Sequence, residues 1–277
     1  MRRFFAVNGV TLCCVTFGGV GPPVLLLHGL CGRGNEWRPT AGWLRGSHQV
    51  FALDQRGHGV SDKATGDYSR DAYVQDAIAV IEQLDVGPVC LVGQSMGGIN
   101  AFLVAARRPD LVRALIVIEA TARDTATPAQ VGIAEALAQW LLPFPTLADT
   151  RDFFRLRGLA ADTWLEILEE HPQDGYWPQF RIPDMIASVA DLGSHDYLAD
   201  WAQIQCPTLV VGGGKSWLPQ APLRDMAAAL PHAAYVVIPD AGHDVHLDDP
   251  DAWHTVAHAF LQRHCGDRSL RDKWATS

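Results

Sequence analysis

The sequence predicts an α/β protein with a mostly parallel, doubly wound sheet, and three observations point to this class. Short apolar runs typical of buried strands alternate with longer runs that have the helical period of about 3.6 residues. Glycine-rich polar motifs follow several of the expected strands, at the edge where such sheets bind ligands. A length of 277 residues with 48% apolar content suits one large globular domain, or one domain with an inserted subdomain.

The N-terminal part is expected to form a hairpin, two buried strands and a short helix. An Asn-Gly turn, typical of two-residue hairpins, joins strands expected at 4–7 and 11–17. The runs at 24–27 and 50–53 are continuously apolar, as strands are when both faces of a sheet are covered. The short helix is expected between these two strands, at 37–44.

The alternation of helix and strand then continues. A helix at 69–84 carries its apolar residues on one face, and strands at 89–92 and 114–118 flank a helix at 99–108. The pattern stops after residue 120 and resumes later in the chain as strand, helix, strand and helix, at 207–212, 223–230, 234–238 and 251–264.

The interruption predicts a helical cap inserted into the core. Its runs look helical, prolines break them, and it is dense in aromatic residues, which suggests an apolar roof over a pocket. The expected domains are a core of residues 1–120 with 201–277 and a cap of residues 121–200. Within the cap, the stretch 175–178 is the expected roof contact, with Trp177 as the substrate-binding side chain.

Charge and composition argue against two kinds of partner. The formal net charge is −9 and no Lys/Arg run is present, so a nucleic-acid surface is not expected. No stretch reaches the roughly 18 apolar residues of a membrane span, so no membrane partner is expected. A homodimer remains an open alternative to a monomer.

The six cysteines are scattered and show no C-x-x-C spacing, which gives no sign of a metal site. Those inside apolar runs are expected to be buried thiols. This pattern predicts a reduced, cytoplasmic protein without a bound metal.

One motif carries the expected chemistry: Gly93-Gln94-Ser95-Met96-Gly97-Gly98, between a strand and a helix. Strand, sharp turn and helix is the context in which G-x-S-x-G presents a nucleophilic serine. Such a tight turn brings the strand end close to the helix start, so the positions two before and two after Ser95 need glycine. Ser95 is therefore the expected nucleophile.

Four motifs in this order resemble the α/β-hydrolase superfamily, and the match covers nearly all of the chain outside the cap. They are His28-Gly29, the run DQRGHGVSD at 54–62, the run GQSMGG at 93–98, and Gly242-His243. The resemblance implies a triad of serine, acid and histidine, a helical cap between strands six and seven, and no cofactor. It does not give the substrate, because this fold hosts many activities.

His243 is the expected base, since it follows a strand and a glycine late in the chain, as the order serine, acid, histidine requires. The family pattern places the oxyanion hole at the backbone N–H groups of Leu30 and Met96. His28 and Arg56 are expected to brace loops rather than to act in catalysis.

The acid is not where the family pattern would place it. The stretch after the cap that usually holds G-x-x-D-x-x-x-P carries Ser216 at the position of the aspartate. A neutral hydroxyl cannot balance an imidazolium as a carboxylate does, so Ser216 is not expected to be the acid.

Glu119 is the expected replacement, because it ends the strand that follows the Ser95 helix. This placement resembles haloalkane dehalogenases with a glutamate after strand six, and zearalenone-type lactonases that pair that glutamate with a serine nucleophile. Because Ser95 is not an aspartate, dehalogenation is not expected. Asp240 and Asp124 remain alternatives for the acid.

The expected function is that of a cofactor-free serine hydrolase acting on a carboxylic ester or lactone with a large apolar part, with a tilt toward macrocyclic lactones. A C–C bond hydrolase or a thioesterase could use the same triad. A non-catalytic binding protein that kept the pocket is the alternative from another class.

Overall fold

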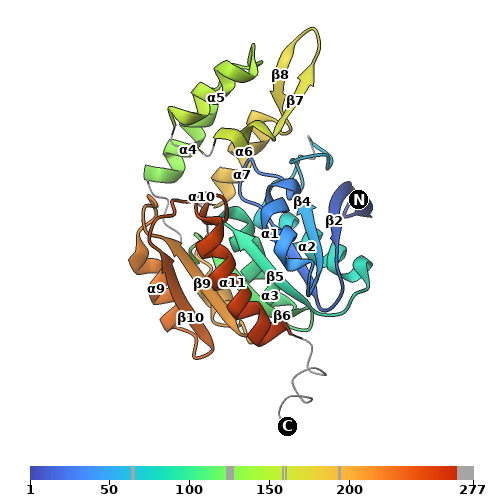
Figure 1. The fold of residues 1–277 in the computed structure, drawn as a ribbon, viewed down its shortest axis with the longest axis vertical. Coiled ribbons are helices and arrows are strands. Elements are labelled where there is room, and N and C mark those ends of the chain that lie inside the picture. Colours follow the sequence, from blue (N-terminus) through green and yellow to red (C-terminus); the bar gives the residue numbers. More distant parts are fainter. Residues whose placement is uncertain (64–65, 123–127, 158, 160, 193–194, 267–277) are drawn as a thin grey trace.

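An eight-stranded sheet forms the centre of the molecule, with strand order β1-β2-β4-β3-β5-β6-β9-β10 (Figure 1). The computed structural model describes residues 1–63, 66–122, 128–157, 159, 161–192 and 195–266. The pairs β1–β2 and β2–β4 are antiparallel, and all other neighbours in this sheet are parallel. The strands are β1 (Arg2–Val7), β2 (Val10–Gly18), β3 (Pro23–Leu27), β4 (Gln49–Asp54), β5 (Val89–Gln94), β6 (Val112–Ile118), β9 (Thr208–Gly213) and β10 (Ala233–Ile238).

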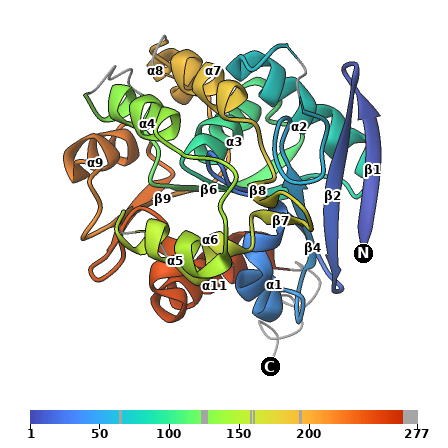
Figure 2. The same cartoon turned by 90° about the horizontal axis from the view of Figure 1, so that it is seen from above.

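Helices cover both faces of this sheet, which confirms the doubly wound α/β class. On one face α1 (Arg38–Leu44) and α11 (Pro250–Cys265) pack against the strands, and the 3-10 turn η1 (Gly34–Trp37) precedes α1 (Figure 2). The other face carries four helices, which share a second buried cluster with the sheet: α2 (Arg70–Leu84), α3 (Met96–Arg107), α8 (Leu198–Trp201) and α9 (Gln220–Ala228). The continuously apolar strands β3 and β5 are buried along their whole length, because both of their faces are covered.

The segment between β6 and β9 lies above the edge of the sheet formed by the ends of the parallel strands (Figure 1). The expectation that it is purely helical is wrong, because it also contains an antiparallel two-stranded sheet, β7–β8. The turn of that hairpin ends at Asp174, and Gly175, the first residue of β8, has φ 80°. The elements of this segment before α8 are α4 (Pro128–Ala138), α5 (Leu147–Arg155), α6 (Ala161–Leu165), β7 (Leu168–His171), β8 (Gly175–Pro178) and α7 (Ile182–Leu192).

The cap segment has a core of its own and is anchored to the sheet domain. Its aromatic side chains pack on one another around Phe154, which is fully buried. Arg70 of α2 reaches α7, where it donates to Ser188 Oγ at 2.5 Å and pairs with Asp191. Helix α8, which crosses the expected domain boundary at residue 200, packs through Trp201 on α3 of the core.

The cysteines are not all thiols, which corrects the sequence-based expectation. Cys90 of β5 and Cys265 of α11 form a disulfide with Cα atoms 6.3 Å apart. Cys13, Cys14 and Cys31 are buried free thiols, and burial raises the pKa of the Cys14 thiol to about 12. A cytoplasmic location stays a prediction; within the described ranges, no helix has the length and apolar character needed to cross a bilayer.

Candidate active site

Ser95 sits in the sharp turn between β5 and α3, with φ 53° and ψ −119°. A non-glycine residue with this backbone conformation is strained, and such strain is concentrated at functional sites. A Cβ atom on Gly93 would lie 2.1 Å from the carbonyl oxygen of Gly97, and one on Gly97 would lie 2.4 Å from that of Leu27. The turn therefore requires both glycines, as the sequence motif predicts.

Glu119 is the first residue after β6, and its side chain is fully buried. Its backbone has φ 52°, and its N–H donates to the carbonyl oxygen of Val211 in β9 at 2.9 Å. The carboxylate oxygen Oε1 accepts the N–H of Gly213 at 2.7 Å. The chain thus leaves the sheet at Glu119, while the carboxylate of this residue stays buried.

His243 meets this carboxylate from the loop between β10 and α10 (Val245–Asp248). Its Nδ1 lies 3.1 Å from Glu119 Oε2, and its ring is 22% exposed. The carbonyl oxygen of His243 accepts a hydrogen bond from Gln94 Nε2 at 3.0 Å, which ties the loop to the turn that holds Ser95. The structure therefore brings together two of the three residues expected to form the triad, 124 positions apart in the sequence.

Ser216 is the residue at this site whose contact the sequence reasoning did not foresee. Its hydroxyl donates to Glu119 Oε2, the same oxygen that faces His243. The signal in the sequence is its position, because it stands where the family pattern implies an aspartate. A hydroxyl at this position cannot replace the acid, but it can donate a hydrogen bond to one.

Ser95 and His243 line one cavity of about 690 Å³ between the cap and the core. Within the described part of the chain, no group hydrogen-bonds the Ser95 hydroxyl. Catalytic hydrogen bonds are often long in free enzymes and tighten when substrate is bound. The Ser95 hydroxyl is therefore open to a ligand in the cavity that His243 also lines.

The walls of this cavity are mostly apolar, and its roof comes from α4 and α6 rather than from the β7–β8 hairpin. The apolar lining side chains are Leu30, Ile133, Leu137, Trp140, Leu159, Trp164 and Trp217. The expectation for Trp177 is wrong: it lies on β8, its Nε1 donates to Asp174 at 3.0 Å, and it does not line the cavity. The ring of Trp217 lies 4.8 Å from that of His243, centroid to centroid, so it forms a wall directly beside the base.

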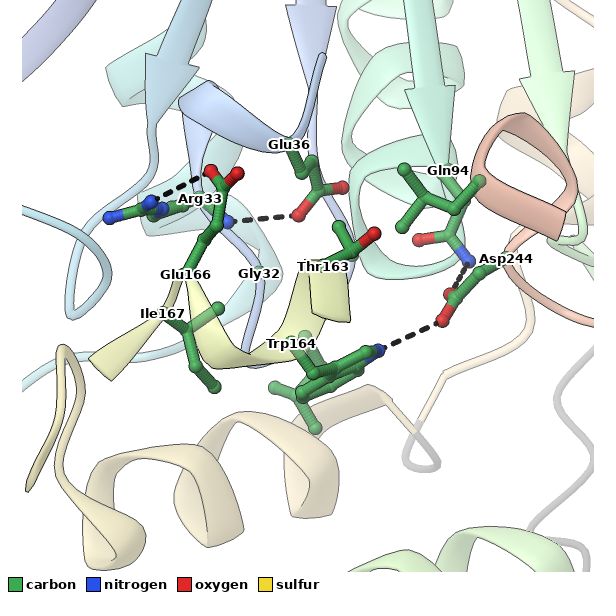
Figure 3. Close-up of a pocket in the computed structure, with 12 residues that line it drawn as sticks. Gly32, Arg33, Glu36, Gln94, Thr163, Trp164, Glu166, Ile167 and Asp244 are labelled. Atoms are coloured by element: carbon green, nitrogen blue, oxygen red, sulfur yellow. Dashed lines mark hydrogen bonds and ion pairs between the residues drawn. The ribbon is translucent and has the colours of Figure 1, made fainter. Parts of the chain in front are cut away.

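A polar chain joins the cap to the histidine loop at one side of this cavity. Figure 3 shows Asp244 between Gln94 and Trp164, around a small neighbouring niche of about 20 Å³. Asp244 accepts from Gln94 Nε2 at 3.3 Å and from Trp164 Nε1 at 3.2 Å. On the far side of the niche, Arg33 bridges to Glu166 of the cap at 3.1 Å (Figure 3). The cap is thus held to the core on both sides of this niche.

The backbone N–H groups of Leu30 and Met96, expected to form the oxyanion hole, have no hydrogen-bond partner within the described residues. Met96 begins α3, where the first N–H groups of a helix have no partner within the helix. Leu30 lies in the loop after β3 and lines the same cavity as Ser95. Both donors are therefore free to bind a ligand.

Two buried histidines brace the Leu30 loop, as expected for His28. His28 Nε2 accepts the N–H of Gln55 at 3.0 Å, and His58 Nε2 accepts the N–H of Cys31 at 3.1 Å. The pKa of His58 is held well below its usual value of 6.5, mainly by burial and to a lesser extent by the neighbouring His28. Arg56 is also structural, since it forms a buried ion pair with Asp76 at 2.7 Å.

Of the two rivals for the acid position, the structure describes only Asp240, and its carboxylate does not pair with the histidine. Asp240 is exposed and pairs with Lys215 at 2.7 Å, which lowers the pKa of its carboxyl group. Asp124 lies outside the described residues. No group of three or more His, Cys, Asp or Glu side chains in the described ranges could hold a metal ion.

Comparisons with known proteins agree with this architecture. A protein-family model described as the alpha/beta hydrolase fold matches residues 22–250. The (E)-2-((N-methylformamido)methylene)succinate hydrolase of Acinetobacter baylyi is 29% identical over 251 residues, which cover 88% of this chain and 92% of that protein. The 2-(acetamidomethylene)succinate hydrolase of Mesorhizobium japonicum is 29% identical over 246 residues, with 84% and 85% covered.

Among solved structures, E-2-(acetamidomethylene)succinate hydrolase superposes with a TM-score of 0.87 at 26% identity, over 95% of this chain and 99% of that one. The family model spans most of the sheet domain and the whole cap. The chain therefore belongs to the α/β-hydrolase fold family.

Proposed function

We propose that this chain is a cofactor-free serine hydrolase that cleaves a carboxylic ester or lactone with a large apolar part. Ser95 is the nucleophile, His243 the general base and then acid, and Glu119 the carboxylate that orients His243. The observation that carries the proposal is the contact between His243 Nδ1 and the buried Glu119, on the floor of an apolar cavity that also exposes Ser95.

The reaction follows from the positions of these groups. Ser95 Oγ attacks the ester carbonyl while His243 takes its proton, and the carbonyl oxygen becomes an oxyanion that the N–H groups of Leu30 and Met96 stabilise. His243 then gives the proton to the leaving alkoxide, which departs as an alcohol. Glu119 balances the imidazolium formed in between.

The second half of the reaction regenerates the serine. His243 removes a proton from a water molecule, and the resulting hydroxide attacks the acyl–Ser95 ester. Collapse of the second tetrahedral intermediate releases the carboxylic acid and returns the proton to Ser95 Oγ. A lactone would open to a hydroxy acid by the same steps.

Hydrolysis of a nitrophenyl ester series with increasing acyl length, beside a series of lactones of increasing ring size, tests this proposal. We expect kcat/KM to rise with apolar size until the cavity of about 690 Å³ is filled. Ser95→Ala should fold normally, lose turnover and no longer react with a fluorophosphonate. Turnover retained in Ser95→Ala would remove the serine mechanism.

A second candidate substrate class is an amide that carries a carboxylate, cleaved by the same three residues. The names of two relatives specify succinate derivatives as their substrates. Two cations, Arg157 and Lys215, line the cavity of this chain among mostly apolar walls. Lys215 is paired with Asp240, whereas the guanidinium carbon of Arg157 lies 3.5 Å from the ring centroid of Phe153.

Arg157→Gln separates the two substrate classes. If the substrate carries a carboxylate, the variant should raise KM for it by about tenfold and leave KM for a neutral ester unchanged. If Arg157→Gln leaves KM for the carboxylate-bearing substrate at its wild-type value, the result favours the neutral ester or lactone.

A further inference from the structure

We propose that Ser216 is a positioning residue, whose hydroxyl holds the Glu119 carboxylate in the orientation that serves His243. The proposal rests on the proposed function, because it gives Ser216 a role only through the triad of Ser95, His243 and Glu119. Ser216 stands at the position where the family pattern implies the triad aspartate, although its own side chain is a neutral hydroxyl.

The hydrogen bonds around Glu119 leave its carboxylate a single orientation. Oε1 accepts the N–H of Gly213 at 2.7 Å, while Oε2 receives Ser216 Oγ and lies 3.1 Å from His243 Nδ1. An ionised carboxylate can only accept hydrogen bonds, so all three neighbours must donate to it. Rotation of the carboxylate about its last bond would break these three contacts together.

The direction of the Ser216 hydroxyl follows from its second contact. Ser216 Oγ accepts the N–H of Leu218 at 3.1 Å, which uses one of its lone pairs. Its single proton is then left for Glu119, which lies nearest and carries the negative charge. The Ser216 N–H in turn donates to the carbonyl oxygen of Gly213 at 3.1 Å, so the backbone of this turn is also fixed.

Close packing keeps this turn beside the histidine loop. A Cβ atom on Gly213 would lie 2.0 Å from the carbonyl oxygen of Gly242, the residue before His243. The end of β9 and the histidine loop therefore approach backbone to backbone. Trp217, the residue after Ser216, lies against the His243 ring. The turn that carries Ser216 thus contacts both the acid and the base.

Loss of this hydroxyl has two expected effects on the reaction. The carboxylate loses one of its three donors and can rotate, so kcat should fall by about tenfold while KM changes little. The negative charge on Oε2 also becomes less compensated, which favours the protonated form of the adjacent imidazole. The acid limb of the kcat/KM profile should therefore move to higher pH.

The decisive experiment compares Ser216→Thr with Ser216→Val, two side chains of the same shape that differ in the hydroxyl. We expect Thr to stay within about threefold of wild-type kcat and to keep the wild-type pH profile. Val should show the lower kcat and the displaced acid limb. Equal kcat values and equal pH profiles in Thr and Val overturn the proposal, because the hydroxyl would then have no part in the reaction.

Two further variants make the result specific. Ser47→Ala removes a half-buried serine on the far side of the core, whose hydroxyl contacts only His48 among the described residues, and should leave kcat and the pH profile unchanged. Glu119→Gln separates the two levels of the argument. If it loses activity while Thr and Val behave alike, only the Ser216 proposal fails; if it keeps activity, the proposed triad fails, and the Ser216 proposal with it.

Discussion

Replacement of Glu119 by glutamine tests the proposed site most directly, because the two side chains have the same shape. In the wild-type protein the carboxylate accepts from Gly213 N–H, from the Ser216 hydroxyl and from His243 Nδ1. A glutamine side chain has only one oxygen. The Gly213 N–H can only donate, so it needs that oxygen as its acceptor. The amide oxygen is therefore expected to face Gly213, which turns the NH₂ group toward His243.

This orientation harms His243 in two ways. The NH₂ group donates to Nδ1 and holds the imidazole in the tautomer whose Nε2 carries the proton, so Nε2 can no longer accept one from Ser95. The neutral amide also leaves the imidazolium formed during the reaction without a counter-charge. We expect kcat to fall by about 10³- to 10⁴-fold, which corresponds to about 4–5.5 kcal/mol of activation free energy.

The assay is kcat on a short-chain nitrophenyl ester, with circular dichroism and a urea unfolding curve to show that the variant is folded. The rate of fluorophosphonate labelling reports the nucleophilicity of Ser95 separately from turnover. A folded Glu119→Gln protein within about fivefold of wild-type kcat would refute the assignment of the acid, because no oriented carboxylate would then be required.

Three other outcomes are expected. Asp240→Asn should keep kcat within about twofold, since its carboxylate faces Lys215; a large loss measured on the same ester would restore Asp240 as the acid. Trp217→Ala should raise KM for an apolar ester by about three- to tenfold, because Trp217 lines the cavity. Trp177→Ala should leave KM unchanged, and steady-state kinetics of both variants on one ester measure the difference. Because the pKa of His58 is lowered in the folded protein, its contribution to stability is complete above about pH 6.5 and is lost as pH falls below that value. Urea midpoints at about pH 7.5 and about pH 5 should therefore differ less in His58→Gln than in wild type, and an equal difference would show that His58 does not titrate on unfolding.

The sequence predicted most of the core because its signals are local. The apolar runs that become β3 and β5 are continuous, and the helices α2 and α11 lie within one or two residues of their expected bounds. The glycines around Ser95 are required by backbone contacts a few ångströms away, so their spacing alone reports the turn. Glu119 could be proposed because parallel strands end at one edge, which places the residue after β6 near those after β9 and β10.

The wrong predictions concern the roof of the cavity, the cap hairpin and the cysteine pairing. These depend mainly on contacts between residues far apart in the sequence. The choice of Trp177 as the roof contact failed because only packing decides that Trp140 and Trp164 face the cavity while Trp177 does not. The β7–β8 hairpin has a usable sequence signal in Asp174-Gly175, which the prediction of a helical cap did not use. The Cys90–Cys265 pair joins residues 175 positions apart, and no spacing rule predicts such a pairing.

The Cys90–Cys265 disulfide has a consequence for a chain cut within the cap. Ser95 and Glu119 precede the cap and His243 follows it, so a single protease cut at the cap surface would divide the proposed catalytic residues between two fragments. Cys90 and Cys265 also lie on opposite sides of such a cut, and their bond keeps the fragments covalently joined. The nicked protein would run as one band on a non-reducing gel and as two bands after reduction. A cut in the cap would thus leave the two halves of the proposed active site on one covalent molecule.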